Sequence, residues 1–427
     1  MDKRRFARST GLMMNICSLL LLSAGLVANA SFLQPDLHLS HEPVLSSYFG
    51  VNVVNLKAGA LPPSIPAKEW RTFEGGWSRV EPLRGTWNFQ ELDREADQAR
   101  MNGATLDIVL GNPPTWAYAH SLKGALSPQE AKGLLPPTTL NDWNTYVQTL
   151  AAHFKGKGYT YELINEPNTK LGYSGTLDSL RDLTCGAYKE IRRTDPTALV
   201  ISSSPAPSGG VKFLNEYLKT GVGKCFDVLG YHFYTIGQSP EYLLKMVKDV
   251  RTSAISNGLG SVPIWNTESG YLIYNGPDSV MRPRQALNPI HVLGEKESAA
   301  ILARCYIVGW LSGLERFYWY SWGDDNFEIV DDRGRTKKAA TVAYSTIYSW
   351  MADSVVEQAT RSSDGTWTVN IRTSHGNRQW IMWNENGSTS IIPNPAWRVH
   401  RLQHLDGTSV PIQGRVLVDI TPILVAP

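Results

Sequence analysis

Two glutamates in this 427-residue chain each follow an apolar run that contains aromatic residues. Glu166 lies in YELINEPN (161–168) and Glu268 lies in VPIWNTESG (262–270). Two carboxyl groups that face each other across a cleft can hydrolyse a glycosidic bond. One carboxylic acid protonates the leaving oxygen, while the other, ionised, attacks the anomeric carbon or activates water. Either glutamate alone would be interpreted as a solvated loop residue, so the prediction of catalysis depends on the pair.

The chain is also rich in side chains that suit sugar rings, with 14 Trp and 18 Tyr. An aromatic ring offers a flat apolar face, and a sugar ring presents C–H groups on one side and hydroxyls around its rim. For each of these aromatic residues, packing in the core is the alternative to sugar binding. The candidates for the sugar subsites are Trp319, Trp322, Trp116 and Tyr173.

The elements that must position these residues are eight apolar runs that alternate with helix-like stretches. Parallel strands buried on both faces give continuous apolar runs rather than strict alternation. Eight such runs predict an α/β fold, a (β/α)8 TIM barrel over residues 31–350. A doubly wound sheet is the alternative, but no Gly-rich phosphate loop follows the first run. The runs are 47–54, 69–73, 104–111, 159–165, 198–204, 226–234, 262–268 and 315–322.

In such a barrel the chemistry lies at the C-terminal ends of the strands. Asn165 and Glu166 end the fourth run, His232 and Tyr234 the sixth, and Glu268 the seventh. We therefore expect these side chains to meet at one mouth of the barrel. His232 could form hydrogen bonds in the site or fill the top of the barrel. Amphipathic helices are predicted over 88–103, 140–154, 177–196 and 339–351.

After residue 351 the pattern changes to short strands separated by turns such as SSDG, NENGS and LDGTS. This pattern predicts a small C-terminal antiparallel β-sandwich domain over residues 351–427. Residues 31–46 could add a strand to it. The predicted strands are 366–373, 378–385, 397–403 and 415–420.

Residues 1–30 combine a basic start, an apolar stretch and the small-residue site Ala-Asn-Ala, which is typical of a secretory signal peptide. An uncleaved membrane anchor is the alternative. We expect export to the periplasm or outside the cell, without stable membrane insertion after cleavage. Cys185, Cys225 and Cys305 remain in the exported chain, so at most one intramolecular disulfide can form, and its pairing is open.

The formal net charge is only +2, and no basic stripe is present. This balance argues against binding of nucleic acid or of anionic membrane surfaces. The cysteines and histidines lack the spacing of a zinc site. We therefore expect no metal or other cofactor, an oligo- or polysaccharide as the partner, and a monomer.

ELINEPN and IWNTESGY resemble the acid/base and nucleophile motifs of clan A glycoside hydrolases. RTFEGGWSRVEPLRGTWNFQELD (71–93) and GYHFYT (230–235) are most similar to family 39, including the PslG-type enzymes that cut bacterial exopolysaccharide. The resemblance covers about residues 45–350. Two features depart from it: TESG stands where PslG-type members carry an aromatic residue after the nucleophile, and the segment 276–298 matches no part of the family pattern.

The resemblance implies a secreted retaining glycosidase with Glu166 as general acid/base and Glu268 as nucleophile. Retention requires the two carboxyl groups to stand about 5–5.5 Å apart. Arg71 and Tyr234 are candidate donors that keep Glu268 ionised, and Asn165 resembles the residue that binds the sugar hydroxyl beside the reacting carbon. A polysaccharide substrate follows, with bacterial exopolysaccharide as one candidate. The sugar, its linkage and endo or exo action stay open, and a non-catalytic carbohydrate-binding protein on the same barrel is the alternative.

Overall fold

The computed structural model describes residues 37–54, 56, 64–118, 135–169, 171–273, 292–323, 327–331 and 336–427. The predicted signal peptide and most of the segment 276–298 lie outside the described residues.

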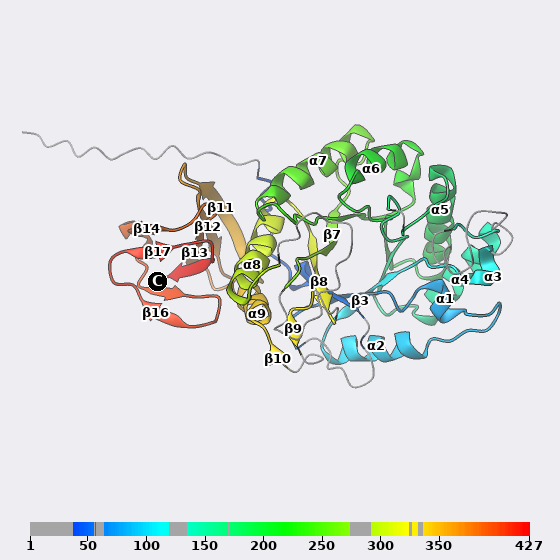
Figure 1. Ribbon diagram of the computed structural model, residues 1–427, viewed down its shortest axis with the longest axis horizontal. Helices are drawn as coiled ribbons and strands as arrows, with labels where there is room; N and C mark the ends of the chain where they lie inside the picture. Colours follow the sequence, from blue (N-terminus) through cyan, green and yellow to red (C-terminus); the bar gives the residue numbers. More distant parts are fainter. Residues whose placement is uncertain are drawn as a thin grey trace, which may run out of the picture. The chain divides into compact units, whose positions relative to one another are not determined.

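Eight parallel strands form one sheet in the order β5-β4-β3-β2-β1-β8-β7-β6. A parallel bridge between Ile201 of β5 and Val228, just before β6, joins the two ends of this order. The sheet therefore closes into the predicted (β/α)8 barrel (Figure 1). Seven strands lie within a predicted run, and β7 extends one residue beyond its run, to Ser269. The bounds are β1 Phe49–Val53, β2 Glu69–Thr72, β3 Thr105–Val109, β4 Thr160–Glu162, β5 Leu199–Ile201, β6 Leu229–His232, β7 Ile264–Ser269 and β8 Arg316–Trp322.

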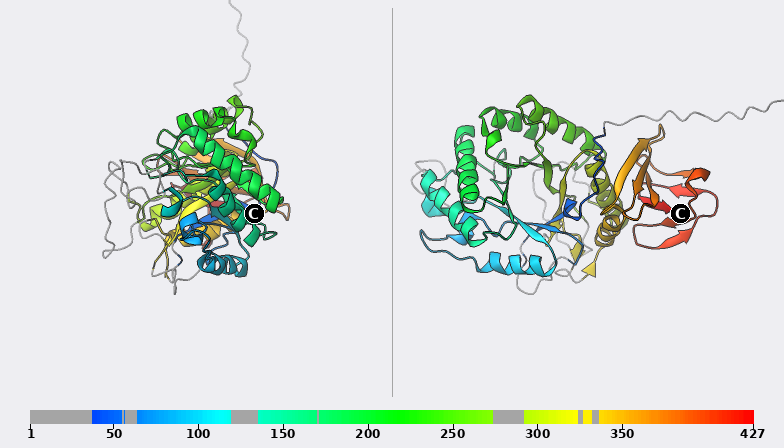
Figure 2. Two further views of the ribbon diagram at one scale, coloured as in Figure 1. Left: turned by 90° about the vertical axis from the view of Figure 1, so that its right-hand side faces the viewer. Right: turned by 180° about the vertical axis from the view of Figure 1, so that it is seen from behind.

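Helices lie around the outside of these strands (Figures 1 and 2). The longest shows why the sequence folds this way: Leu180, Ala187 and Ile191 of α5 are buried on one face. The Thr176 side chain caps its first turn by accepting from the Ser179 amide. The helices are α1 Trp77–Val80, α2 Gln90–Met101, α3 Thr115–Tyr118, α4 Leu140–His153, α5 Leu177–Thr194, α6 Gly210–Lys219, α7 Tyr242–Ser256, α8 Glu295–Leu311 and α9 Ala339–Met351.

The C-terminal residues form the predicted antiparallel β domain (Figure 1). Its larger sheet has the order β11-β12-β13-β18-β15-β16, and β14 pairs with β17 beside it. The Trp383 indole N–H donates to Glu241 at the start of α7, which ties the domain to the barrel. The strands are β11 Val355–Arg361, β12 Thr366–Arg372, β13 Arg378–Asn384, β14 Thr389–Ile391, β15 Arg401–Gln403, β16 Ser409–Pro411, β17 Val416–Val418 and β18 Ile423–Ala426.

The expectation that residues 31–46 add a strand to this domain is wrong for the described part, 37–46. Val44 does exchange two backbone hydrogen bonds with the start of the domain, with Ser354 and Asp353. The chain then turns into the short 3₁₀ helix Ser46–Tyr48 and enters β1. Two hydrogen bonds without a continuing ladder anchor the segment but do not make it a strand.

Cys185 in α5 and Cys225, which follows the 3₁₀ helix Val222–Lys224, form a disulfide. Cys305 is a free thiol buried in α8. The pairing that the sequence left open is therefore Cys185 with Cys225. Among the described residues, no helix has both the length and the apolar character needed to cross a membrane.

Candidate active site

Glu166 and Glu268 meet at the C-terminal mouth of the barrel although about a hundred positions separate them in the sequence. Glu166 lies four residues beyond the end of β4, and Glu268 lies within β7. One carboxylate oxygen of each lies within 4.8 Å of the other. The two environments differ, because the Glu166 side chain is 27% exposed and that of Glu268 is 10% exposed. The pair that the sequence predicted is therefore brought together.

The backbone at Glu166 has an uncommon conformation, with φ at +45°. Its amide donates to the Ser204 carbonyl, and its own carbonyl accepts from both the amide and the hydroxyl of Thr169. Gly172 packs against the same peptide so closely that a Cβ there would lie 1.8 Å from the Glu166 carbonyl oxygen. The loop after β4 thus fixes the direction in which Glu166 leaves the backbone.

Two side chains donate hydrogen bonds to the Glu268 carboxylate. Arg71 Nη1 lies 2.7 Å from Oε2, and the Tyr234 hydroxyl lies 2.6 Å from Oε1. Burial, and then the negative charge of Glu268, raise the pKa of Tyr234 well above its ordinary value. The phenol therefore keeps its proton and remains a donor. Both predicted donors are in place, and both stabilise the ionised form of Glu268.

Arg71 is fully buried and contacts more than the predicted pair. Its Nε and Nη2 lie 2.5 Å and 3.1 Å from the two carboxylate oxygens of Glu162. Nη1 also donates to Asn52, and Nη2 donates to Oδ1 of Asn165 at 2.8 Å. Burial alone would lower the pKa of Arg71, but Glu162 and Glu268 outweigh it and raise the pKa. Arg71 is therefore a permanent cation shared by two carboxylates.

His232 lies between three carboxylates and is fully buried. Its Nδ1 is 3.0 Å from Oε1 of Glu166 and 3.7 Å from Oε1 of Glu268. Its Nε2 is 4.0 Å from Glu162 and has no hydrogen-bond partner among the described residues. Of the two roles that the sequence left open, the geometry favours hydrogen bonding in the site, beside Glu166.

Several residues that complete this site were not predicted from the sequence. Glu162 is the most prominent, since a fully buried carboxylate in the middle of the run TYELIN was a visible signal. Thr267 had no such signal, because Thr is common in strands. Asn52 did have one, because Asn is uncommon in strands. The Thr267 hydroxyl donates to Glu162, and the Asn52 amide donates to the Thr267 carbonyl.

The aromatic candidates are placed differently from the polar ones. Trp319 and Trp322 are 0% and 1% exposed and belong to the hydrophobic core, so neither offers an open ring face to a sugar in this structure. Trp116 is half-buried under the guanidinium of Arg84, and its N–H donates to a backbone carbonyl. The Tyr173 hydroxyl is bonded to Ser179 at the start of α5. These contacts favour packing roles for the aromatic residues, and sugar stacking by them stays a prediction.

Glu166, His232 and Glu268 are also the group among the described residues whose ligand atoms could hold a metal ion. Two carboxylates and an imidazole are a donor set that transition metals accept. However, the Arg71 guanidinium already forms an ion pair with Glu268 at 2.7 Å. A fixed cation at that distance opposes a second one, so the charge arrangement favours acid–base chemistry over metal binding.

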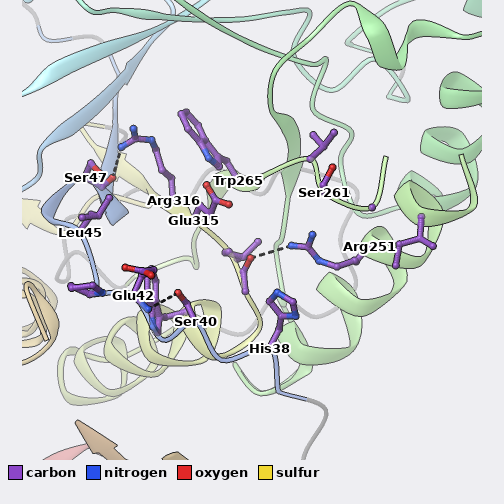
Figure 3. A pocket seen from close by; sticks show the side chains of 17 residues that line it. His38, Ser40, Glu42, Leu45, Ser47, Arg251, Ser261, Trp265, Glu315 and Arg316 are labelled. Carbon is purple, nitrogen blue, oxygen red and sulfur yellow. Dashed lines mark hydrogen bonds between the residues drawn. The ribbon is translucent and has the colours of Figure 1, made fainter. Parts of the chain in front are cut away.

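A pocket lined by none of the residues of this site is shown in Figure 3. It has a volume of about 810 Å³ and is lined by Trp265 and Arg316, which stand at the beginnings of β7 and β8. That end of a barrel serves stability rather than catalysis. A smaller pocket of about 360 Å³ is lined by Tyr234 together with Ser208 and Gln238, which follow β5 and β6. The smaller pocket shares Tyr234 with the site, but neither Glu166 nor Glu268 lines it.

Solved structures of other proteins share this fold. A solved family 39 glycoside hydrolase from Bacteroides cellulosilyticus WH2 aligns with 90% of this chain and 81% of its own, at a TM-score of 0.66 and 18% identity. A GH30 endoxylanase from Clostridium papyrosolvens C71 aligns with 91% of this chain and 98% of its own, at a TM-score of 0.60 and 12% identity.

In sequence, endo-1,4-beta-xylanase 1 of Humicola insolens is 29% identical over 94 residues, which is 21% of this chain. The match spans about a fifth of that curated relative, 19% of its length. No protein-family model matches the chain. The predicted likeness in fold is confirmed: this chain has the barrel and β-domain fold that the solved glycoside hydrolases share.

Proposed function

We propose that this protein is a retaining glycoside hydrolase that cleaves O-glycosidic bonds in a polysaccharide. The observation that carries the proposal is the short separation of Glu166 and Glu268. One carboxylate oxygen of Glu166 lies within 4.8 Å of one carboxylate oxygen of Glu268. Retaining enzymes hold their carboxyl groups about 5–5.5 Å apart, whereas inverting enzymes need about 6.5–9.5 Å to admit a water molecule. The described geometry fits the shorter class.

In the first step, Glu268 attacks the anomeric carbon while Glu166 protonates the leaving oxygen, which gives a covalent glycosyl-enzyme. Arg71 and Tyr234 hold the attacking carboxylate ionised and aimed. In the second step, Glu166 takes a proton from water, and the water displaces Glu268 with net retention. Asn165 is oriented by Arg71 toward a role at the sugar hydroxyl next to the reacting carbon.

The substrate is proposed as a polysaccharide outside the cytoplasm, with bacterial exopolysaccharide as the first candidate. The solved neighbours include a family 39 enzyme and an endoxylanase, which supports a carbohydrate substrate without choosing the sugar. The disulfide between Cys185 and Cys225 supports export, because such bonds persist in oxidising compartments. Amino-terminal sequencing of the protein recovered from the periplasm or medium should begin at Ser31. Recovery of full-length chain in the membrane fraction would contradict cleavage and favour the uncleaved membrane anchor.

The decisive test is to trap the intermediate with a panel of activated 2-fluoro glycosides and to locate the label by mass spectrometry. We expect one label on Glu268, no label in Glu268→Gln, and a folded Glu268→Gln variant whose turnover is lower by about a thousand-fold or more. A label on another residue would refute the nucleophile. Binding across a wide glycan panel without any product would favour the non-catalytic alternative.

A chelator separates this proposal from metal-assisted hydrolysis at the same three side chains. Turnover should be unchanged after exhaustive treatment with EDTA, since Arg71 already supplies the positive charge beside Glu268. Loss of turnover that returns on adding a divalent metal would instead assign the group Glu166, His232 and Glu268 as a metal site.

A further inference from the structure

Glu162 lies below the carboxylate pair and has no solvent exposure. It accepts two hydrogen bonds from Arg71 and one from the Thr267 hydroxyl at 3.1 Å. Thr267 directly precedes Glu268 in β7, and Arg71 itself contacts Glu268 at 2.7 Å. Glu162 is therefore connected to the proposed nucleophile through Arg71 and through Thr267, although it does not itself contact the substrate.

Glu162, Arg71 and Glu268 form a buried row of three charges, in which one cation pairs with two anions. Burial alone would raise the pKa of Glu162, but the positive charge of Arg71 outweighs it and lowers the pKa, so Glu162 stays ionised. Two carboxylates compete for one guanidinium, and each weakens the hold of Arg71 on the other. A buried cation with a single carboxylate partner would bind that partner more tightly.

We propose that Glu162 is a positioning residue that acts through Arg71. It holds the Arg71 guanidinium in place beside Glu268 and partly neutralises its positive charge. The Glu268 carboxylate is thereby both oriented and kept nucleophilic. This inference deepens the proposed function and rests on it, because the nucleophilic role of Glu268 belongs to that proposal. It concerns a residue that does not touch the sugar, so its signature is a change in the behaviour of Glu268 rather than a lost contact with substrate.

The other groups that face Glu162 do not replace this role. Burial, followed by the charge of Glu162, raises the pKa of Asp107 in β3 well above its ordinary value, so Asp107 holds its proton. The pKa of Tyr318 in β8 is raised well above its ordinary value, first by burial, and the phenol is neutral. His232 of β6 lies 4.0 Å away with no hydrogen bond to Glu162. Arg71 is thus the cation through which Glu162 acts.

The test is Glu162→Gln, which keeps the shape and removes the charge. In this variant Arg71 forms an ion pair with Glu268 alone, and the negative charge of Glu162 is absent. Glu268 should therefore stay ionised to lower pH and become a weaker nucleophile. We expect kcat to fall at least about tenfold with KM little changed, and the acidic limb of the pH–rate profile to move down by about one pH unit. Glu162→Asp, which keeps the charge, should keep the acidic limb near its wild-type position.

Glu69→Gln is the matched control, because Glu69 is a buried carboxylate that pairs with Arg316 at the other end of the barrel. It also removes a buried carboxyl group, but it should leave the acidic limb at its wild-type position. An unchanged kcat and limb in Glu162→Gln, or an equal movement of the limb in Glu69→Gln, would overturn the inference.

A second measurement separates this inference from the proposed function. Carbon-13 NMR of glutamate-labelled protein, with Glu268→Gln to assign the signal, follows the Glu268 carboxyl through a pH titration without any turnover. Its midpoint should be lower in Glu162→Gln than in wild type, whether or not the protein hydrolyses a given glycoside. An unmoved midpoint would refute the role of Glu162, whereas absence of hydrolysis by wild type would refute only the proposed function.

Discussion

The Tyr234 hydroxyl lies 2.6 Å from Oε1 of Glu268, while Arg71 holds the opposite oxygen of the same carboxylate. The two donors come from different strand ends, β2 and the loop after β6. Each carboxylate oxygen thus has its own donor, which fixes the plane of the group as well as its charge. This relationship gives the most direct prediction about the site.

Tyr234→Phe should lower kcat about 10- to 100-fold, because a hydrogen bond to a charged group contributes about 1.5–3 kcal/mol. Loss of the donor disfavours the ionised carboxylate, so the acidic limb of the pH–rate profile should move to higher pH. The direction is opposite to that expected for Glu162→Gln, and steady-state kinetics across pH distinguish the two variants. A Tyr234→Phe enzyme with wild-type kcat would show that this bond has no part in turnover.

Gly172→Ala should lower kcat while leaving the fold intact. The added Cβ would lie 1.8 Å from the Glu166 carbonyl oxygen and 2.5 Å from its carbonyl carbon. Backbone atoms cannot swing aside as the end of a side chain can, so the peptide that carries Glu166 must move, and displacement of a catalytic group by about 1 Å can reduce the rate about a hundredfold. Circular dichroism should be unchanged. Gly294→Ala is the control for introducing a methyl group at a glycine, because nothing lies within 4 Å of the added Cβ and the backbone φ there is −71°.

Glu95 should make the protein less stable as the pH rises. This carboxyl in α2 is 1% exposed and accepts from Thr72, and burial, despite that hydrogen bond, raises its pKa to about 8 from an ordinary 4.5. Between these values the folded state keeps the proton that the unfolded state releases. Stability is therefore full below about pH 4.5 and falls, at up to about 1.4 kcal/mol per pH unit, until about pH 8.

The measurement is thermal melting of wild type and Glu95→Gln between pH 5 and pH 8. Wild type should lose more of its Tm than the variant over this range, because glutamine does not ionise. Glu69, whose pKa is raised to about 7 by burial, leaves a smaller residual dependence in the variant. Parallel Tm curves for the two proteins would contradict the buried protonated state of Glu95.

The disulfide between Cys185 and Cys225 closes a sequence separation of 40 residues. In the chain-entropy account, such a link stabilises the folded state by about 4 kcal/mol. Replacing both cysteines with alanine should lower the denaturant midpoint accordingly, and reduction of wild type should reproduce the change. The denatured exported protein should show one free thiol, that of Cys305. An unchanged midpoint, or three reactive thiols, would contradict the bond.

The barrel could be predicted from the sequence because its cause is local. Each strand is buried on both faces, so runs such as TLDIV and the apolar start of IWNTES carry their own signal. Glu166 and Glu268 could be found for the same reason, since each follows such a run. The β domain was harder, because β11, β14, β16 and β18 were not predicted. Of these, β14 and β16 have only three residues each, and VVEQATR and ILVA lack the clear turn-to-turn framing of their neighbours.

By itself, therefore, the sequence determined the eight strands, the helices α2, α4, α5 and α9, and the two glutamates at strand ends. Only the tertiary structure decided that Arg71 is shared between Glu162 and Glu268, that His232 lies beside Glu166, and that Trp319 is in the core. The physical reason is the closure of the barrel. Hydrophobic periodicity is a local pattern that shows which faces of one strand or helix are buried. The charges of the site instead interact over about 3 Å between strands that are far apart in the sequence.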